Sequence, residues 1–125
     1  EILCKGDSVM KAILIDPITS TVKEVDYSGD YKDIYKLIGC RTFDVVSIPV
    51  GLDGIYVDDE GLFAPLQFRW EYRYNRMHPP IQLVNKGLVL GCDDEGDSIS
   101  PDSTVESIRR SITWEWTNEK KVKTA

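Results

Sequence analysis

Apolar and polar residues follow one another along the chain with the periods of short strands and short helices. Lys11–Asp16 is apolar on both faces, as a central strand is, and Thr21–Tyr27 alternates after a polar turn. Two such segments around a short turn predict a hairpin. Further strands are predicted at Phe43–Ile48, Gly54–Val57 and Leu88–Leu90.

Two segments carry helical spacing instead. Apolar residues recur every three or four positions over Tyr31–Ile38, and a glycine follows where a helix commonly ends in a left-handed residue. The second helix is predicted to open at Ser100-Pro101 and to end near Arg110, because proline is tolerated in a first helical turn. Within it, Ser103 and Glu106 have the spacing of a capping box.

The clearest strand pattern is the period-two segment Gln67–Asn75. Its aromatic residues share one face, and its charged and amide residues share the other. The aromatic face consists of Phe68, Trp70, Tyr72 and Tyr74. Because each buried aromatic side chain removes about 150–250 Å² from water, this strand is predicted to anchor the core. A last strand is predicted from Ile112 to Trp116.

The predicted order of elements is β-β-α-β-β-β-β-α-β, with too few helices to connect parallel strands. It predicts an α+β domain with a mainly antiparallel sheet and two short helices. One domain is expected over residues 10–117. Residues 1–9 are expected to be a leader or an upstream extension, because Met10 opens the first strand as a start codon would. The polar residues 118–125 are expected to be a disordered tail.

Composition and charge narrow the classes of function. The 125 residues are 42% hydrophobic, as in a folded globular chain. Lys and Arg number 15 against 21 Asp and Glu, which gives a net charge of −6. This balance argues against general nucleic-acid binding, which requires a basic surface. No apolar stretch approaches the roughly 20 residues of a membrane span, so no membrane partner is expected.

The counts of cysteine and histidine exclude further chemistry. Cys4, Cys40 and Cys92 form neither a disulfide framework nor a zinc or redox pair, so a reducing compartment is expected. The single histidine, His78, cannot build a multi-histidine zinc site and is expected in a loop. No nucleophile motif and no phosphate-binding glycine motif is present. The sequence therefore predicts neither a catalytic residue nor a cofactor.

An acidic tetrapeptide occurs twice, as Asp58-Asp59-Glu60-Gly61 and as Asp93-Asp94-Glu95-Gly96 followed by Asp97. Hard cations bind clustered carboxylates, so one hypothesis is a metal site built from Asp58, Asp59, Asp93, Asp94 and Asp97. The calcium-loop pattern fails at Ser98, where glycine is required. Two polar hairpin turns are the favoured interpretation, the first of them leading from Gly54–Val57 into Leu62-Phe63.

A second candidate site follows the aromatic strand, because arginine and exposed aromatic rings clamp and stack nucleotides or single-stranded nucleic acid. The candidate ligand-binding residues are Arg69, Trp70, Tyr72, Arg73, Tyr74 and Arg76. A buried aromatic face opposite a solvated charged face is the favoured alternative, although a small domain does not easily bury every ring. Arg109 and Arg110 are expected to be solvated and to complement the dipole of the second helix.

Four segments in series carry a resemblance to a known family. They are Lys11–Pro17, Ile34–Cys40, Ile55–Leu62 and Gly87–Asp97. Together they resemble a family of small proteins, a domain of unknown function, encoded by bacteriophages, plasmids and conjugative elements. The resemblance spans residues 10–112 and is weakest over Leu66–Pro80. It brings no activity and no catalytic residues. It implies a bacterial or phage-infected cytoplasm and an accessory role in host physiology or defence.

These observations favour a non-enzymatic accessory binding protein of a phage or mobile element, acting on a host protein or on a small anionic, nucleotide-like ligand. An acidic decoy that imitates nucleic acid is a second hypothesis. A third is a carboxylate-dependent hydrolase with one cation held between the two acidic turns. A homo-oligomer, or a place in a larger assembly, would bury leftover aromatic surface.

Overall fold

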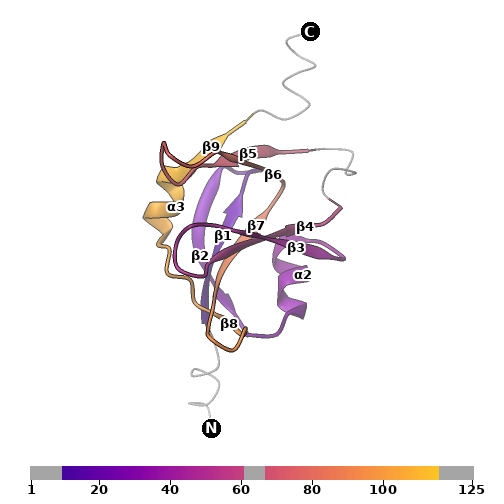
Figure 1. Cartoon of the computed structure of the whole chain (residues 1–125). Coiled ribbons are helices and arrows are strands. Elements are labelled where there is room, and N and C mark those ends of the chain that lie inside the picture. Colours follow the sequence, from indigo (N-terminus) through magenta and orange to yellow (C-terminus); the bar gives the residue numbers. More distant parts are fainter. Residues whose placement is uncertain (1–9, 61–66, 116–125) are drawn as a thin grey trace.

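The computed structural model describes residues 10–60 and 67–115 and has the predicted α+β class. Figure 1 shows two helices on different sides of mainly antiparallel strands. The elements are β1 (Met10–Asp16), β2 (Thr21–Tyr27), α2 (Lys32–Ile38), β3 (Phe43–Ser47), β4 (Gly54–Asp58), β5 (Arg69–Tyr72), β6 (Ile81–Val84), β7 (Gly87–Cys92), β8 (Ser98–Ile99), α3 (Val105–Ser111) and β9 (Ile112–Trp114). The short strands β6 and β8 are added to the predicted order.

The main sheet has the order β2-β1-β7-β4-β3, and β8 pairs with β7. Every pair is antiparallel, including the predicted β1–β2 hairpin. The apolar runs of β1 and β7 lie at its centre, where both faces are covered. One face packs on α2 through a cluster that includes Leu14, Ile34 and Leu90. Helix α2 ends, as predicted, at Gly39 in the left-handed conformation, with φ of 68°.

The small sheet, β6-β5-β9, lies against the other face of the main sheet (Figure 1). Its central strand contributes Trp70 and Tyr72, which are almost completely buried with Ile108 of α3. The Trp70 indole N–H donates to the backbone oxygen of Asn85 at 2.7 Å. A side chain at Gly87 would meet this ring at about 3.1 Å, so a glycine there lets Trp70 approach the main sheet closely. The predicted role of the aromatic strand in the core is confirmed for these two rings.

The aromatic strand is shorter in the structure than the predicted segment Gln67–Asn75. Strand β5 ends at Tyr72, and Tyr74 lies beyond it with 46% of its surface exposed. The pairing of β5 with β6 ends at Tyr72 and Ile81, because the next residue, Pro80, has no N–H to donate. On the other side, the Arg73 N–H continues the β5–β9 pairing by donating to the Ser111 oxygen at 2.9 Å. Phe68 is half-buried before the strand begins. The prediction that all four rings share one buried face is therefore wrong for Tyr74.

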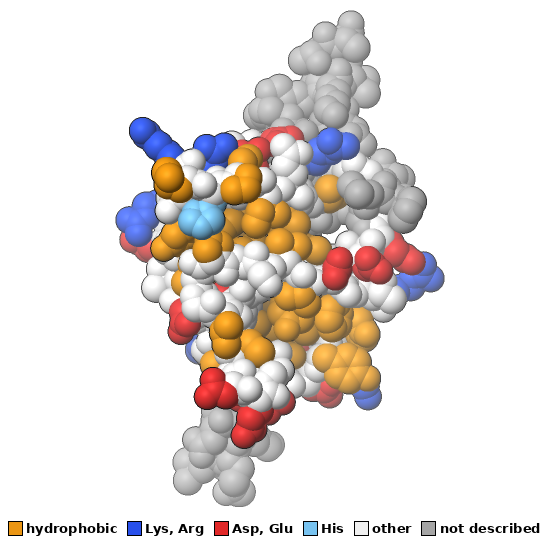
Figure 2. All heavy atoms as spheres, viewed as in Figure 1, with side chains coloured by type: hydrophobic (Ala, Val, Ile, Leu, Met, Phe, Trp, Pro, Cys, Tyr) orange, Lys and Arg blue, Asp and Glu red, His pale blue; other side chains and the backbone are white. Residues whose placement is uncertain are grey.

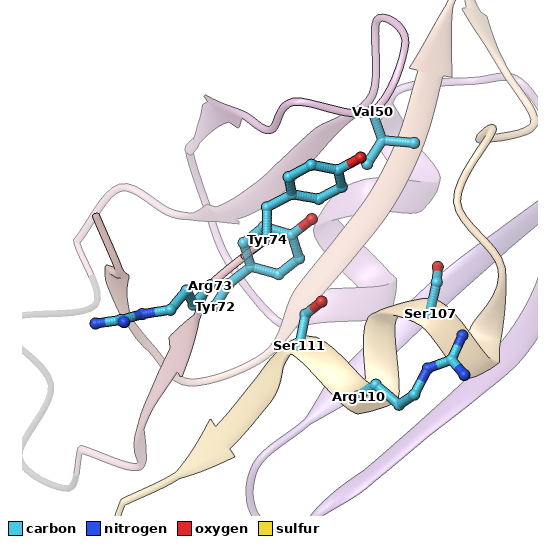
Figure 3. A pocket seen from close by; sticks show the side chains of 7 residues that line it. All are labelled: Val50, Tyr72, Arg73, Tyr74, Ser107, Arg110 and Ser111. Carbon is cyan, nitrogen blue, oxygen red and sulfur yellow. The ribbon is translucent and has the colours of Figure 1, made fainter. Parts of the chain in front are cut away.

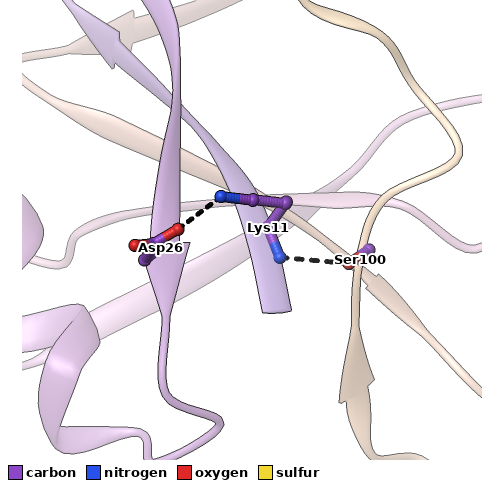
Figure 4. A network of polar contacts seen from close by, with 3 residues as sticks. All are labelled: Lys11, Asp26 and Ser100. Atoms are coloured by element: carbon purple, nitrogen blue, oxygen red, sulfur yellow. Dashed lines mark hydrogen bonds and ion pairs between the residues drawn. The ribbon is translucent and has the colours of Figure 1, made fainter. Parts of the chain in front are cut away.

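The prediction for the start of the second helix is also wrong. Helix α3 begins at Val105, and its capping box joins Thr104 to Ser107 rather than Ser103 to Glu106. Ser103 is instead buried against Asp53, and the Ser100 hydroxyl accepts the backbone N–H of Lys11 at 3.2 Å. In Figure 4 the same Lys11 also forms an exposed ion pair with Asp26 on β2. These tertiary contacts hold residues 100–103 in a non-helical conformation, so the helix starts after them.

Several predictions fall on residues outside the described ranges. They concern residues 1–9 and Cys4, the Leu62-Phe63 arm of a hairpin, Trp116 and the tail over residues 118–125. Neither helix of the described part has the length and apolar character needed to cross a membrane.

Candidate functional site

A half-open pocket of about 250 Å³ lies where three separate parts of the chain meet. Its walls come from the β3–β4 loop, from the end of β5 with the residues after it, and from α3. The lining residues are Val50, Tyr72, Arg73, Tyr74, Ser107, Arg110 and Ser111 (Figure 3). The lining contains one apolar aliphatic side chain, two tyrosines, two serines and two arginines, and it contains no carboxylate.

The pocket forms because α3 continues directly into β9, which pairs with β5. In this pairing Tyr72 lies opposite Ile112, the first residue after the helix. The last turn of α3 is thereby placed beside the end of β5, and the Arg73 N–H to Ser111 oxygen bond closes the contact. The capping box at Thr104 and Ser107 fixes the other end of the helix and engages the Ser107 hydroxyl.

Hydrogen-bond donors gather on the inside of this pocket. Figure 3 shows the side chains of Tyr72 and Tyr74 directed toward Val50 and α3, whereas the Arg73 side chain extends the opposite way. Arg110 reaches out from α3 on the side of Ser107. Within the described residues, no hydrogen bond or ion pair engages the guanidinium of Arg110 or the hydroxyl of Tyr74. The described lining therefore offers one free guanidinium, that of Arg110, and one free hydroxyl, that of Tyr74.

Tyr72 is uncharged at neutral pH and adds no negative charge to the lining. Burial raises the pKa of the Tyr72 hydroxyl above its ordinary value of 10.0, and nearby Tyr74 and Asp53 raise it further. A side-chain hydrogen bond with Ser111 acts in the opposite direction. The net shift is upward, so the hydroxyl stays protonated at neutral pH and is available as a donor.

A buried carboxylate holds two walls of the pocket together. Asp53, at the end of the β3–β4 loop, is only 2% exposed. Its carboxylate accepts the backbone N–H groups of Asp102 and Ser103 at 2.9 and 2.8 Å, and the Ser103 hydroxyl at 2.6 Å. Three donors offset the cost of burying the charge. Asp53 thus couples the loop that carries Val50 to the segment that leads into α3, and the sequence alone did not single it out.

The structure brings together only part of the predicted ligand-binding set. Tyr72 and Tyr74 line the pocket, and Arg73 lines it without directing its guanidinium inward. Trp70 is 0% exposed, so it cannot stack on a ligand, which corrects that prediction. Arg69 is half-buried and donates to Gln67. Arg76 is exposed in the β5–β6 loop and outside the lining. The three candidate arginines therefore do not converge on one site.

Arg110, Ser107 and Ser111 are the pocket residues that sequence reasoning missed. Arg110 is exposed, as expected of a solvated residue in the last helical turn, yet it also lines the pocket. Its neighbour Arg109 turns away and donates to the Val22 oxygen on β2 at 3.0 Å. The sequence did contain one signal for them, the alternating segment that begins at Ile112 directly after the helix. Its pairing with the aromatic strand places the last turn of α3 beside that strand.

The two acidic turns lie far apart, so they cannot share one cation. In the antiparallel β4–β7 pair, Val57 lies opposite Gly87, and Asp93 follows Gly87 by 93 − 87 = 6 residues. Six extended residues span ~20 Å, whereas ligands lie about 2.0–2.6 Å from a metal ion. The described ranges contain no group of three or more His, Cys, Asp or Glu side chains able to hold a metal. The hypothesis of a hydrolase with one shared cation is therefore wrong.

The first aspartate of each acidic motif has the role expected in a turn, because its carboxylate accepts backbone N–H groups of the same turn. Asp93 caps the β7–β8 hairpin by accepting the backbone N–H groups of Glu95 and Asp97, each at 2.9 Å. Asp58 accepts the N–H of Glu60 at 2.9 Å in the same manner. Figure 2 shows acidic side chains toward the edges of this face, with apolar side chains around its centre. The acidic clusters are thus separate from the pocket.

The two described cysteines are half-buried, and the histidine lies in a loop, as predicted. Cys40 and Cys92 are free thiols, and burial, with a smaller effect of Asp58, raises the pKa of Cys40 to about 11. Cys40 is consequently a poor nucleophile at neutral pH. His78 lies in the β5–β6 loop, where its Nδ1 is 2.7 Å from the Asn75 side-chain oxygen. Its ring packs edge-to-face on Tyr74, with centroids 5.3 Å apart, and so supports one wall of the pocket.

Comparison with protein families places the chain in one of them. The model of the family described as Domain of unknown function (DUF3846) matches residues 10–113. The chain belongs to this family, whose matched region runs from β1 into β9 and includes every pocket residue. The searches of curated proteins and of solved structures each found no match.

Proposed function

We propose that this protein is a non-enzymatic accessory binding protein that takes a small anionic ligand in the pocket beside Arg110. The observation that carries the proposal is the lining itself, in which a guanidinium without a partner and hydroxyl donors surround a space that no carboxylate enters. In a chain of net charge −6, such a local concentration of donors selects an anion at this place.

The same lining favours binding over acid–base chemistry. Proton transfer in catalysis requires a group whose pKa lies near the operating pH, usually an imidazole or a carboxylate. The lining holds arginine, tyrosine and serine, and the pKa of Tyr72 is shifted away from neutrality. These groups orient and neutralise an anion without exchanging protons with it. A role in a phage or mobile element, acting in the cytoplasm, is proposed from the family resemblance.

Thermal unfolding in the presence of anions tests this proposal. A ligand that binds only the folded chain stabilises it by about 2.7 kcal/mol at one hundred times its Kd. In a screen of phosphate-bearing compounds that includes cyclic nucleotides, we expect the ligand to raise the melting temperature of the wild type and of Arg76→Gln. Arg110→Gln should lose the stabilisation. Wild-type protein that no anion stabilises, or equal losses in both variants, would contradict the proposal.

A host protein is a second candidate ligand, favoured by a row of rings on the opposite side of the main sheet. Tyr31, Tyr35, Phe43 and Tyr56 contact one another in series, with centroids 5.9, 5.5 and 5.3 Å apart. Tyr31 is 55% exposed, and tyrosine is common at the centres of protein interfaces. Photo-cross-linking from position 31 in host cells, with exposed Ile18 as the control position, should give an adduct only from position 31. The adduct mass separates a host partner from a second copy of this chain, and equal labelling from both positions would exclude this surface.

A further inference from the structure

We infer that the ligand class of the pocket is a nucleoside monophosphate, with its phosphate at Arg110 and its ring at Tyr74. This inference rests on the proposed function and deepens it. It follows from three features of the site, namely the chemistry of the donors at its α3 side, the support of the Tyr74 ring, and the volume that the walls enclose.

The α3 side suits a phosphate monoester. A guanidinium offers five N–H donors in a planar fork that matches two phosphate oxygens. The hydroxyls of Ser111 and Tyr72, which are hydrogen-bonded to each other, also line the pocket and add polar contacts for a tetrahedral group. A planar carboxylate has only two oxygens and would leave some of these donors without an acceptor. The lining holds no carboxylate that would repel a phosphate dianion.

The opposite wall suits a flat ring. The Tyr74 ring is 46% exposed and is held edge-to-face by His78, at an interplanar angle of 86°. His78 is itself fixed by Asn75, which also accepts the backbone N–H groups of Met77 and His78. A tyrosine ring that is supported along its edge keeps a face available for stacking on a base. Val50 adds an apolar contact on this side of the pocket.

The size of the pocket limits the number of phosphates. Sites for drug-sized ligands enclose about 300–1,000 Å³, and this pocket encloses about 250 Å³. The Arg73 side chain extends away from α3, so the guanidinium of Arg110, beside Ser107, is the one cation of the lining at the α3 side (Figure 3). A second and third phosphate would therefore find neither space nor a countercharge. The base is free to extend through the open side past Tyr74.

Isothermal titration of the full chain with four probes tests the inference. The probes are uridine monophosphate, ribose 5-phosphate, inorganic phosphate and uridine triphosphate. We expect the monophosphate to bind tightest. Ribose 5-phosphate should bind about tenfold more weakly because it lacks the stacking base, and inorganic phosphate weaker still. The triphosphate should bind no tighter than the monophosphate.

Matched variants locate each half of the ligand. Arg110→Gln should weaken uridine monophosphate at least about tenfold, whereas Arg76→Gln, outside the lining, should leave its Kd unchanged. Tyr74→Leu should remove the advantage of uridine monophosphate over ribose 5-phosphate. Tyr31→Leu, at a distant exposed tyrosine, should keep that advantage. Circular dichroism of all four variants confirms that a loss of binding is not a loss of folding.

The outcomes separate this inference from the proposed function. If ribose 5-phosphate binds as tightly as uridine monophosphate through Arg110, or if the triphosphate binds much tighter, the inference is overturned and the anion pocket stands. If no probe and no other anion binds, or if Arg76→Gln weakens binding as much as Arg110→Gln, both are overturned.

Discussion

The main sheet and the small sheet are stabilised in different ways, and the candidate site belongs to the second. The main sheet buries apolar runs on both faces, and its central residues Ile15, Leu88 and Val89 are 0% exposed. The small sheet and α3 add single polar anchors to their buried rings: the Trp70–Asn85, Asp53–Ser103 and Arg109–Val22 hydrogen bonds. The main sheet therefore provides the scaffold, whereas the small sheet and α3 position the hydrogen-bond donors around the pocket.

The largest expected effect comes from the ring that joins the two sheets. Trp70→Ala should lower the free energy of unfolding by about 3–5 kcal/mol, because it leaves a cavity and an unpaired Asn85 carbonyl. Tyr31→Ala, at an exposed ring, should cost less than about 1 kcal/mol. Urea denaturation measures both. Similar losses in the two variants would show that Trp70 does not couple the layers.

The next largest effect is expected at Asp53, where the scaffold holds the segment before α3. Asp53→Ala leaves two buried donors on Ser103 and one part-buried donor on Asp102 without an acceptor, and should cost about 3 kcal/mol. Asp53→Asn keeps one acceptor oxygen and should cost roughly half as much. Chemical denaturation measures these stabilities. Titration should also show that uridine monophosphate binds more weakly to both variants, since Val50 and α3 lose their common anchor. Full stability in Asp53→Ala would refute this role.

Neighbouring arginines on α3 provide a sharper test of the division of labour. Arg109→Gln removes the bond to Val22 on the main sheet and should cost about 1 kcal/mol of stability, with anion binding retained. Arg110→Gln should change stability by less than about 0.5 kcal/mol and lose anion binding. Chemical denaturation measures the stability of both variants, and calorimetry measures their anion binding. Loss of anion binding in Arg109→Gln, with binding retained in Arg110→Gln, would show that the site is not at Arg110.

The smallest effect is expected from the acidic turns. Asp59→Lys with Asp94→Lys should change stability by less than about 0.5 kcal/mol per site, because both side chains are exposed. Binding of uridine monophosphate at physiological salt should change much less than in Arg110→Gln. The same double variant tests the acidic-decoy alternative in a pull-down with a host partner, since a decoy loses its partner on charge reversal.

The two layers also differ in how far the sequence predicts them. The apolar runs at residues 11–16 and 88–90 predict central strands because burial on both faces leaves no other place for them. Residues 100–103 carry the local signals of a helix start, yet Ser100 and Ser103 bond to Lys11 and Asp53, distant in the chain. Local propensity cannot contain such long-range contacts. Strand β6, after two prolines, was missed for a related reason, since its pairing with β5 is tertiary.

The same limit applies to the candidate site. Tyr72 and Tyr74 could be singled out because aromatic residues in a strand pattern are visible in the sequence. Arg110 could not, because its place in the pocket depends on the register between β5 and β9. Arg73, which stands between the two tyrosines in the sequence, points away from them, since alternate residues of an extended chain face opposite sides.

Amide chemical-shift mapping by NMR during a titration with uridine monophosphate tests the central claim most directly. If the nucleotide binds in the pocket beside Arg110, we expect saturable shifts confined to the residues around Val50, Tyr72–Tyr74 and Ser107–Ser111. These shifts should be lost in Arg110→Gln. Shifts centred on the acidic turns at residues 58–60 and 93–97, or shifts that persist unchanged in Arg110→Gln, would contradict this claim.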